Sequence, residues 1–338
     1  MQSPAPKVCV RCGEPRILAP ECPRCGVLYA KARAPRPEAP AVETPPLAPP
    51  LAPDTSATPL APERMAERGL FAQREQEEAQ REERLLRFAL PGVLGAAWLL
   101  DAAEFGVLPR RVLRMLLHET GHAVTAWFCG HPALPTPFWV TQISERSTFF
   151  FALLAFALVG LVFRGVLTRA PRTRDLGLAG LGLQFVGSVW MTPSQRDMAI
   201  GFGGDGGAMV LGTVLMLALY APPHSWPRRG GLHWGLAFIG AVSFTVTFRN
   251  WWATRTDFER LPFGEMEGVG LSDASRLVEG HGWDELTLIH RYTTLGLACL
   301  ALLALVYGGS LWKARAARQA LTSRGRDARR YRPRAPPA

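Results

Sequence analysis

Long apolar segments fill the chain of 338 residues after residue 87, and they constrain its fold more than any other feature. Seven segments follow one another: 88–108, 111–130, 147–168, 176–193, 196–221, 231–252 and 289–312. A helix needs about 20 predominantly apolar residues to cross a bilayer. Because no soluble domain needs so many segments of this kind, we expect an all-α polytopic membrane protein, with residues 88–312 as its membrane domain.

The distribution of charge indicates how the segments cross the bilayer. The tail 313–338 holds nine basic residues and one acidic residue, so we expect it to be cytoplasmic. The loop 253–288 holds eight acidic and three basic residues, and we expect a solvated segment on the opposite side. The segment 88–108 is interrupted by one proline and two carboxylates (Pro91, Asp101 and Glu104), so we interpret it as a re-entrant or interfacial hairpin. About six transmembrane helices remain, which places both termini in the cytoplasm of, we expect, a bacterial inner (plasma) membrane.

The N-terminal region contains two C-x-x-C pairs, Cys9 with Cys12 and Cys22 with Cys25. Four thiolates at this spacing can surround one zinc ion tetrahedrally, so we expect a structural zinc site. A redox dithiol is the alternative, and it would explain one pair but not two. The segment resembles a zinc ribbon over residues 7–28, which predicts a small domain over residues 1–32 that could recruit a protein partner.

Two polar segments separate this domain from the membrane domain. Residues 33–63 are rich in proline and alanine, which predicts a disordered linker. Residues 64–87 alternate glutamate with arginine, which predicts a solvated, charged helix. The net charge of +10 does not indicate a nucleic-acid partner, because the basic residues border apolar segments and are not interleaved with aromatic residues.

The segment 111–130 contains the sequence His118-Glu119-Thr120-Gly121-His122, which has the pattern H-E-x-x-H. Residues four apart lie on one face of a helix, so both imidazoles can bind the same metal ion. Glu119 can then act as a general base toward a metal-bound water. Ionisable residues are costly in lipid, and a functional role is the default interpretation of such residues there.

A catalytic zinc site needs a third protein ligand. Glu145 follows in a loop, and we expect it to lie outside the membrane. Asp205 is the better candidate, because glycines surround it within an apolar segment and would allow a helix or substrate backbone to approach closely. His118 and Asp205 also lie at similar depths in their segments, at about 1.5 Å per residue. The alternative is that Asp205 caps the helix that follows it.

These residues resemble the site-2 protease family of intramembrane zinc metalloproteases, the M50 class. The similarity rests on His118, Glu119, His122 and the Asp205-Gly206-Gly207 run, and it extends over residues 111–222. It implies that His118, His122 and Asp205 bind the catalytic zinc and that Glu119 is the base. The family usually has an Asn and a Pro shortly before the Asp, and here no Asn precedes Asp205 at that distance. The family also has a membrane-associated strand after the first motif, for which 136–143 is the candidate, with an interfacial loop as the alternative.

We therefore expect an intramembrane zinc metallopeptidase that hydrolyses peptide bonds of membrane-embedded protein substrates. A catalytically inactive scaffold, which recruits a partner through the zinc ribbon, is the main alternative. A solute transporter is a third interpretation, but the sequence has no internal repeat of the kind that transporters show. Loss of Glu119 discriminates between the first two, because a scaffold would tolerate it.

Overall fold

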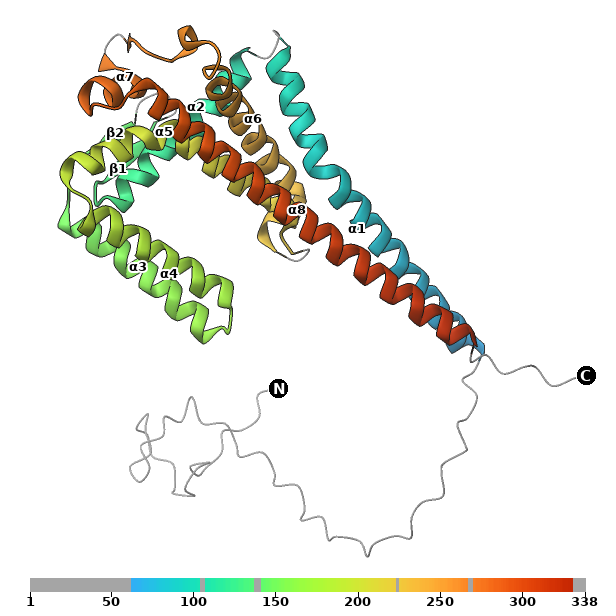
Figure 1. Cartoon of the computed structure of the whole chain (residues 1–338). Helices are drawn as coiled ribbons and strands as arrows, with labels where there is room; N and C mark the ends of the chain where they lie inside the picture. Colours follow the sequence, from blue (N-terminus) through green and yellow to red (C-terminus); the bar gives the residue numbers. More distant parts are fainter. Residues whose placement is uncertain (1–61, 104–106, 137–140, 223–224, 267–269, 331–338) are drawn as a thin grey trace, which may run out of the picture. The chain divides into compact units, whose positions relative to one another are not determined.

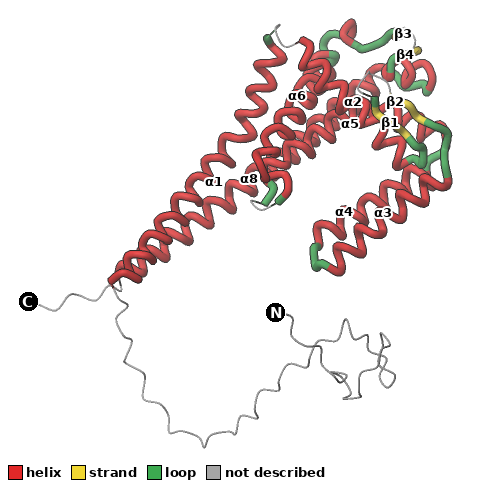
Figure 2. Tube along the Cα trace, turned by 180° about the vertical axis from the view of Figure 1, so that it is seen from behind, coloured by secondary structure: helices red, strands yellow, loops and turns green. Residues whose placement is uncertain are grey.

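The computed structural model describes residues 62–103, 107–136, 141–222, 225–266 and 270–330 (Figure 1). Cys9, Cys12, Cys22 and Cys25, which are expected to form the zinc ribbon, lie outside the described residues, as does the linker up to residue 61. The described part is mainly helical, as expected from the apolar segments (Figure 2). Its helices are α1 (Pro62–Ala102), α2 (Val107–Phe128), α3 (Thr148–Leu167), α4 (Pro171–Phe185), α5 (Pro193–Leu217), α6 (Leu232–Ala253), α7 (Asp273–Ser275) and α8 (Glu285–Arg330).

Within the residues that the structure describes, five helical stretches are long and apolar enough to cross a membrane: Gln73–Ala102, Thr148–Leu167, Pro193–Tyr220, Trp226–Ala253 and Glu285–Ser323. Two expected spans are not among them. Helix α2 carries three arginines and Glu119 within its 22 residues, and α4 is only 15 residues long before a π-helical turn, Val186–Trp190, continues it. The finding supports a membrane protein, with fewer clear spans than the apolar segments alone suggested.

Residues 88–102 do not form the hairpin that we expected. They continue one helix, α1, which also includes the charged segment 64–87 and accommodates Pro91 without ending. Asp101 lies at the end of α1, where Arg110 and Arg249 form ion pairs with it. Arginines of two neighbouring helices therefore neutralise the carboxylate that suggested a hairpin tip.

Local sequence signals explain where α3 and α5 begin. The Ser147 side chain accepts a hydrogen bond from the backbone N–H of Phe150 at the start of α3. Thr192 and Gln195 form a capping box at the start of α5, and Pro193 occupies its first position. These caps satisfy backbone N–H groups that have no partner within the helix.

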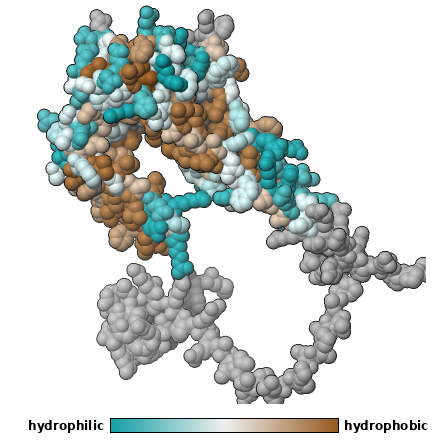
Figure 3. Space-filling view, viewed as in Figure 1, coloured by the Kyte–Doolittle hydropathy of each residue, from teal (hydrophilic) through white to brown (hydrophobic). Residues whose placement is uncertain are grey.

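The α3–α4 hairpin exposes large apolar side chains. Phe149 and Phe156 on α3 are each 77% exposed, and Leu167 is 80% exposed. Figure 3 shows this hydrophobic surface, together with hydrophilic surface where α1 and α8 extend away from the other helices. Contiguous apolar surface of this kind is unfavourable in water, so a lipid environment explains it.

Helix α5 packs extensively against both α2 and α6, and glycines allow their close approach. A Cβ atom on Gly121 of α2 would collide with the backbone oxygen of Gly203 and lie 2.9 Å from the Cα atom of Gly207, both on α5. Gly212 of α5 meets Gly240 of α6 in the same way. The polypeptide backbones therefore touch at these crossings, as in membrane helix pairs with small interfacial residues.

Two short antiparallel hairpins flank the helices. Strand β1 (Ala133–Pro135) pairs with β2 (Thr141–Ile143), so strand structure forms in part of the predicted segment 136–143. Strand β3 (Glu265–Met266) pairs with β4 (Gly270–Leu271) within residues 254–284, which connect α6 to α8 and are called the cap below. Leu277 and Ala274 of the cap are buried in the main hydrophobic core, at 0% and 3% exposure. The cap is therefore packed onto the helices.

Candidate metal centre

Two histidines of the H-E-x-x-H sequence converge on one face of α2. The Nε2 atoms of His118 and His122 lie 3.2 Å apart, and the two rings meet edge to face. His122 is 8% exposed, and the side chain of His118 is 13% exposed. The predicted helix and the shared face of the histidines are thus both present, since residues four apart on a helix are neighbours.

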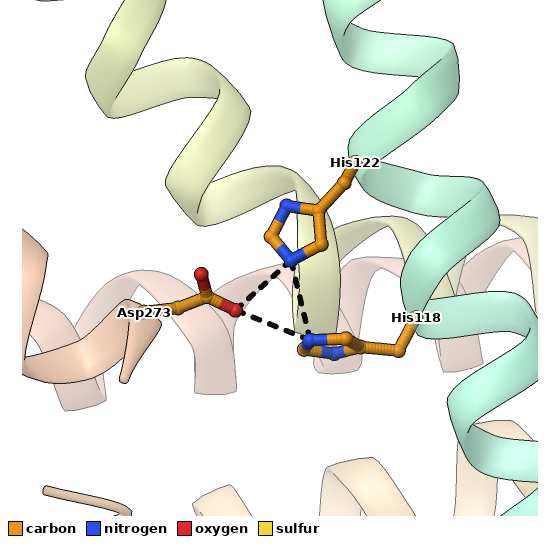
Figure 4. Close-up of side chains that lie close together, drawn as sticks. All are labelled: His118, His122 and Asp273. Atoms are coloured by element: carbon orange, nitrogen blue, oxygen red, sulfur yellow. Dashed lines mark hydrogen bonds and ion pairs between the residues drawn. The ribbon is translucent and has the colours of Figure 1, made fainter. Parts of the chain in front are cut away.

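A carboxylate from the cap completes the group. Oδ2 of Asp273 lies 3.1 Å from Nε2 of His118 and 3.0 Å from Nε2 of His122 (Figure 4). Asp273 therefore presents one carboxylate oxygen to both ring nitrogens.

The other ring nitrogen of each histidine contacts an acceptor. Nδ1 of His118 lies 2.9 Å from Oδ1 of Asp205, and Nδ1 of His122 lies 2.7 Å from the backbone oxygen of Ile200. A backbone oxygen and an ionised carboxylate only accept hydrogen bonds, so these contacts assign the proton of each neutral imidazole to Nδ1. The Nε2 lone pairs then point at each other and at Asp273.

With both imidazoles neutral, three electron-pair donors this close repel one another unless a cation lies between them. Zinc in proteins has about 2.0–2.1 Å bonds to histidine nitrogen and about 2.0–2.2 Å bonds to carboxylate oxygen. A tetrahedron with such bonds has edges of about 3.3 Å. The observed separations of 3.0, 3.1 and 3.2 Å fit these edges. A metal-binding histidine usually makes a hydrogen bond through the ring nitrogen that does not bind the metal. The Nδ1 atoms of His118 and His122 make contacts of this kind.

Asp205 does not join the group of converging atoms, although the resemblance implied that it is a ligand. Its Oδ1 atom contacts Nδ1 of His118 and accepts a hydrogen bond from Nη2 of Arg114 at 3.0 Å. Its Oδ2 atom accepts a hydrogen bond from Nε1 of Trp251 at 2.8 Å. Nor does Asp205 cap a helix, because it lies in the interior of α5. In this structure the carboxylate orients His118 from behind.

The imidazoles of His118 and His122 lie against Gly204, which explains why a glycine directly precedes Asp205. A Cβ atom on Gly204 would collide with Nε2 of His122 and lie 2.6 Å from Cε1 of His118. A side chain at this position would therefore displace the imidazoles. The sequence predicted a close approach by a neighbouring helix or a substrate, and the neighbouring helix is the one found, since α2 packs against α5 here.

Glu119 contacts the β1–β2 hairpin. Its side chain is buried at 5% exposure, and Oε2 accepts a hydrogen bond from Oγ1 of Thr141 at 2.7 Å. Oγ1 of Thr141 also lies 2.9 Å from the backbone oxygen of Glu119. Thr141 of β2 therefore contacts Glu119, the candidate base on α2.

All these side chains line one cavity of about 520 Å³. Glu119, Thr141 and the three converging residues form part of its wall, and the cap supplies Phe263 and Arg276 among others. The volume lies within the range of about 300–1,000 Å³ that is usual for small-molecule and cofactor sites. The two histidines and Glu119 therefore face one shared space.

The sequence interpretation missed Asp273. We expected the loop 253–288, which includes the cap, to be a solvated acidic segment, and its eight carboxylates gave no reason to select one. A weak signal was available, because Ser272 precedes Asp273 as a helix cap and fixes the chain locally, and its hydroxyl accepts from the N–H of Ser275. Glu145 is exposed and does not line the cavity, in agreement with its lower rank as a candidate.

Comparison with protein families, curated proteins and solved structures found no match to this chain.

Proposed function

We propose that this chain is a zinc-dependent peptidase that cleaves membrane-embedded proteins. The observation that supports the proposal most strongly is the convergence of His118 Nε2, His122 Nε2 and Asp273 Oδ2 within 3.2 Å, with both Nδ1 atoms anchored. Zinc bound there would polarise a peptide carbonyl and lower the pKa of water. The resemblance to site-2 proteases implies Asp205 as the third ligand. We propose Asp273 as the third ligand instead, with Asp205 orienting His118.

Glu119 is the proposed general base. It lies between the two histidines in sequence, is buried, and lines the cavity that they share. Its carboxylate can accept the proton of the attacking water and return it to the leaving amine. Asp205 and the backbone oxygen of Ile200 keep the imidazoles in one tautomer during this exchange.

Strand β2 is the proposed place for the substrate backbone. Thr141 and Ile143 of this strand line the cavity. The sheet has two strands in the part of the chain that the structure describes, so one edge of β2 remains for an added strand. An unwound substrate segment could pair with that edge, which would hold its peptide bonds beside Glu119.

The metal of the N-terminal region is a separate proposal. The four cysteines at 9, 12, 22 and 25 have the spacing of a structural zinc site, and we propose that they bind a second zinc ion. Such a module folds with its metal and suits a protein partner. It gives no chemistry to the membrane domain.

Cleavage by the full chain in lipid nanodiscs tests the proposal. The probe is a set of quenched-fluorescent peptides, each with an apolar segment of about 20 residues. We expect cleavage by the unmodified protein, loss of cleavage with a chelator, and recovery when zinc is added. Glu119→Gln keeps an acceptor for Thr141 but is a poor base, so it should abolish cleavage while zinc stays bound. Equal signals from the unmodified protein and Glu119→Gln would favour the scaffold.

A further inference from the structure

Thr141 has a contact that the H-E-x-x-H pattern does not explain. Its hydroxyl lies 2.7 Å from the Glu119 carboxylate and 2.9 Å from the Glu119 backbone oxygen. It comes from β2, 22 residues after Glu119 in sequence. A hydroxyl has one proton and can also accept a hydrogen bond. Thr141 can therefore donate to only one of these two oxygens at a time.

This arrangement fixes the position of the carboxylate. Thr141 donates to Oε2 of Glu119 from β2, so the carboxylate has a hydrogen-bond partner outside its own helix. Glu119 is buried at 5% exposure, and in a buried site an unpaired polar group is costly. The hydroxyl therefore favours one orientation of the Glu119 side chain.

Thr141 also connects the base to the strand that we propose for the substrate. Thr141 and Ile143 lie two apart on β2, so both side chains emerge on the same face, and both line the cavity. A peptide that pairs with β2 would fix the position of Thr141 relative to α2. The hydrogen bond from Thr141 would then fix the position of the Glu119 carboxylate as well.

We infer that Thr141 is a positioning residue, which orients the Glu119 carboxylate and links it to the strand proposed to bind the substrate. The inference rests on the proposed function. It concerns the rate of the chemical step rather than metal binding, because Thr141 contacts none of the three converging atoms.

The test compares Thr141→Val, which keeps the shape and removes the hydroxyl, with Thr141→Ser, which keeps the hydroxyl. Full-length protein in nanodiscs is assayed with the quenched-fluorescent peptides, and zinc content is measured on the same samples. We expect Thr141→Val to keep its zinc and to lose about 10- to 100-fold in kcat, with KM changed less than about threefold. Thr141→Ser should recover most of kcat. Thr168→Val is the matched control, because that hydroxyl contacts only a backbone oxygen at the end of α3.

A measurement without turnover complements the kinetics. A peptide hydroxamate binds zinc and gives its proton to a neighbouring base, so its affinity reports the position of Glu119. We expect Thr141→Val and Glu119→Gln both to weaken hydroxamate binding, and Thr168→Val to leave it unchanged. Unchanged kcat and hydroxamate affinity in Thr141→Val would overturn the inference while leaving the peptidase proposal intact. An unmodified protein that neither binds zinc at the histidines nor cleaves would overturn both.

Discussion

Asp205 contacts His118 at Nδ1, with a separation of 2.9 Å, and so lies on the far side of the ring from the nitrogen that faces His122. Nη2 of Arg114 and the indole N–H of Trp251 hold the carboxylate in this position. The same residue type that the family resemblance assigns to the metal therefore acts here on the imidazole. This relationship separates the residues that we propose as ligands from those that orient them.

Replacement of Asp205 by Asn should weaken zinc binding without abolishing it. The amide oxygen can still accept the Nδ1 proton of His118, but it carries no charge. Loss of an outer contact to a metal-binding histidine typically costs about 10- to 100-fold in metal affinity. Competition with a fluorescent zinc chelator would measure the change. A complete loss of one zinc per chain at saturating zinc would instead make Asp205 a ligand.

Trp251→Phe should destabilise the helical domain. The indole of Trp251 is 2% exposed, donates to Asp205, and stacks on Tyr292 with ring centroids 4.1 Å apart. Phenylalanine keeps much of the stacking but leaves a buried carboxylate oxygen without its donor, at a cost of about 1–3 kcal/mol. Thermal unfolding in detergent would show a lower Tm. Trp312→Phe, at a position 71% exposed, is the control and should leave Tm nearly unchanged.

The fold could be predicted from the sequence where apolar length decides it. The long segments became helices, because a membrane-length apolar run satisfies its backbone groups only within a helix or a closed barrel. The interpretation of residues 88–108 as a hairpin was wrong for residues 88–102, since it treated Asp101 as an interruption of the apolar segment. Its partners, Arg110 and Arg249, come from two other helices, and such pairing is not visible in one segment.

The candidate site could be predicted where its residues are close in sequence. His118 and His122 are four residues apart, and helical geometry alone places them together. Asp273 follows His122 by 151 residues, and only the packing of the cap onto the helices brings it to the histidines. The glycine run around Asp205 correctly predicted a close approach. The glycine run did not reveal which carboxylate would face the Nε2 atoms of His118 and His122.

Gly121→Ala should be strongly unfavourable, because α2 and α5 touch at this position. The added methyl group would collide with the backbone of Gly203, and backbone cannot move aside as a flexible side chain can. Overpacking of this kind typically costs about 1–3 kcal/mol, and it would also move His122, the next residue. Gly160→Ala on α3 is the control, since nothing lies within 4 Å of the added atom. It should be neutral or stabilise the helix by up to about 1 kcal/mol. Equal Tm values for the two variants would contradict the close packing.

Leu277→Ala should lower the affinity for zinc, although Leu277 is not a proposed zinc ligand. Leu277 is fully buried and anchors the cap four residues after Asp273. Truncation of a buried leucine typically costs about 2–5 kcal/mol, and here the loss should loosen the cap locally. We expect faster hydrogen exchange in the cap and lower zinc affinity, with little change in α3. Leu286→Ala, at a position 65% exposed, should change neither. Unchanged zinc affinity in Leu277→Ala would show that Asp273 does not depend on this anchor.

Zinc stoichiometry of the full chain, measured by elemental analysis at saturating zinc, tests the metal centre most directly. The comparison is between Asp273→Ala and Asp205→Asn, with His122→Ala as the positive control and Glu279→Ala, an exposed acidic residue of the cap, as the negative control. Relative to the unmodified chain, we predict a loss of one zinc in Asp273→Ala and His122→Ala and none in Asp205→Asn and Glu279→Ala. Retention of that zinc in Asp273→Ala, with its loss in Asp205→Asn, would contradict the centre of His118, His122 and Asp273.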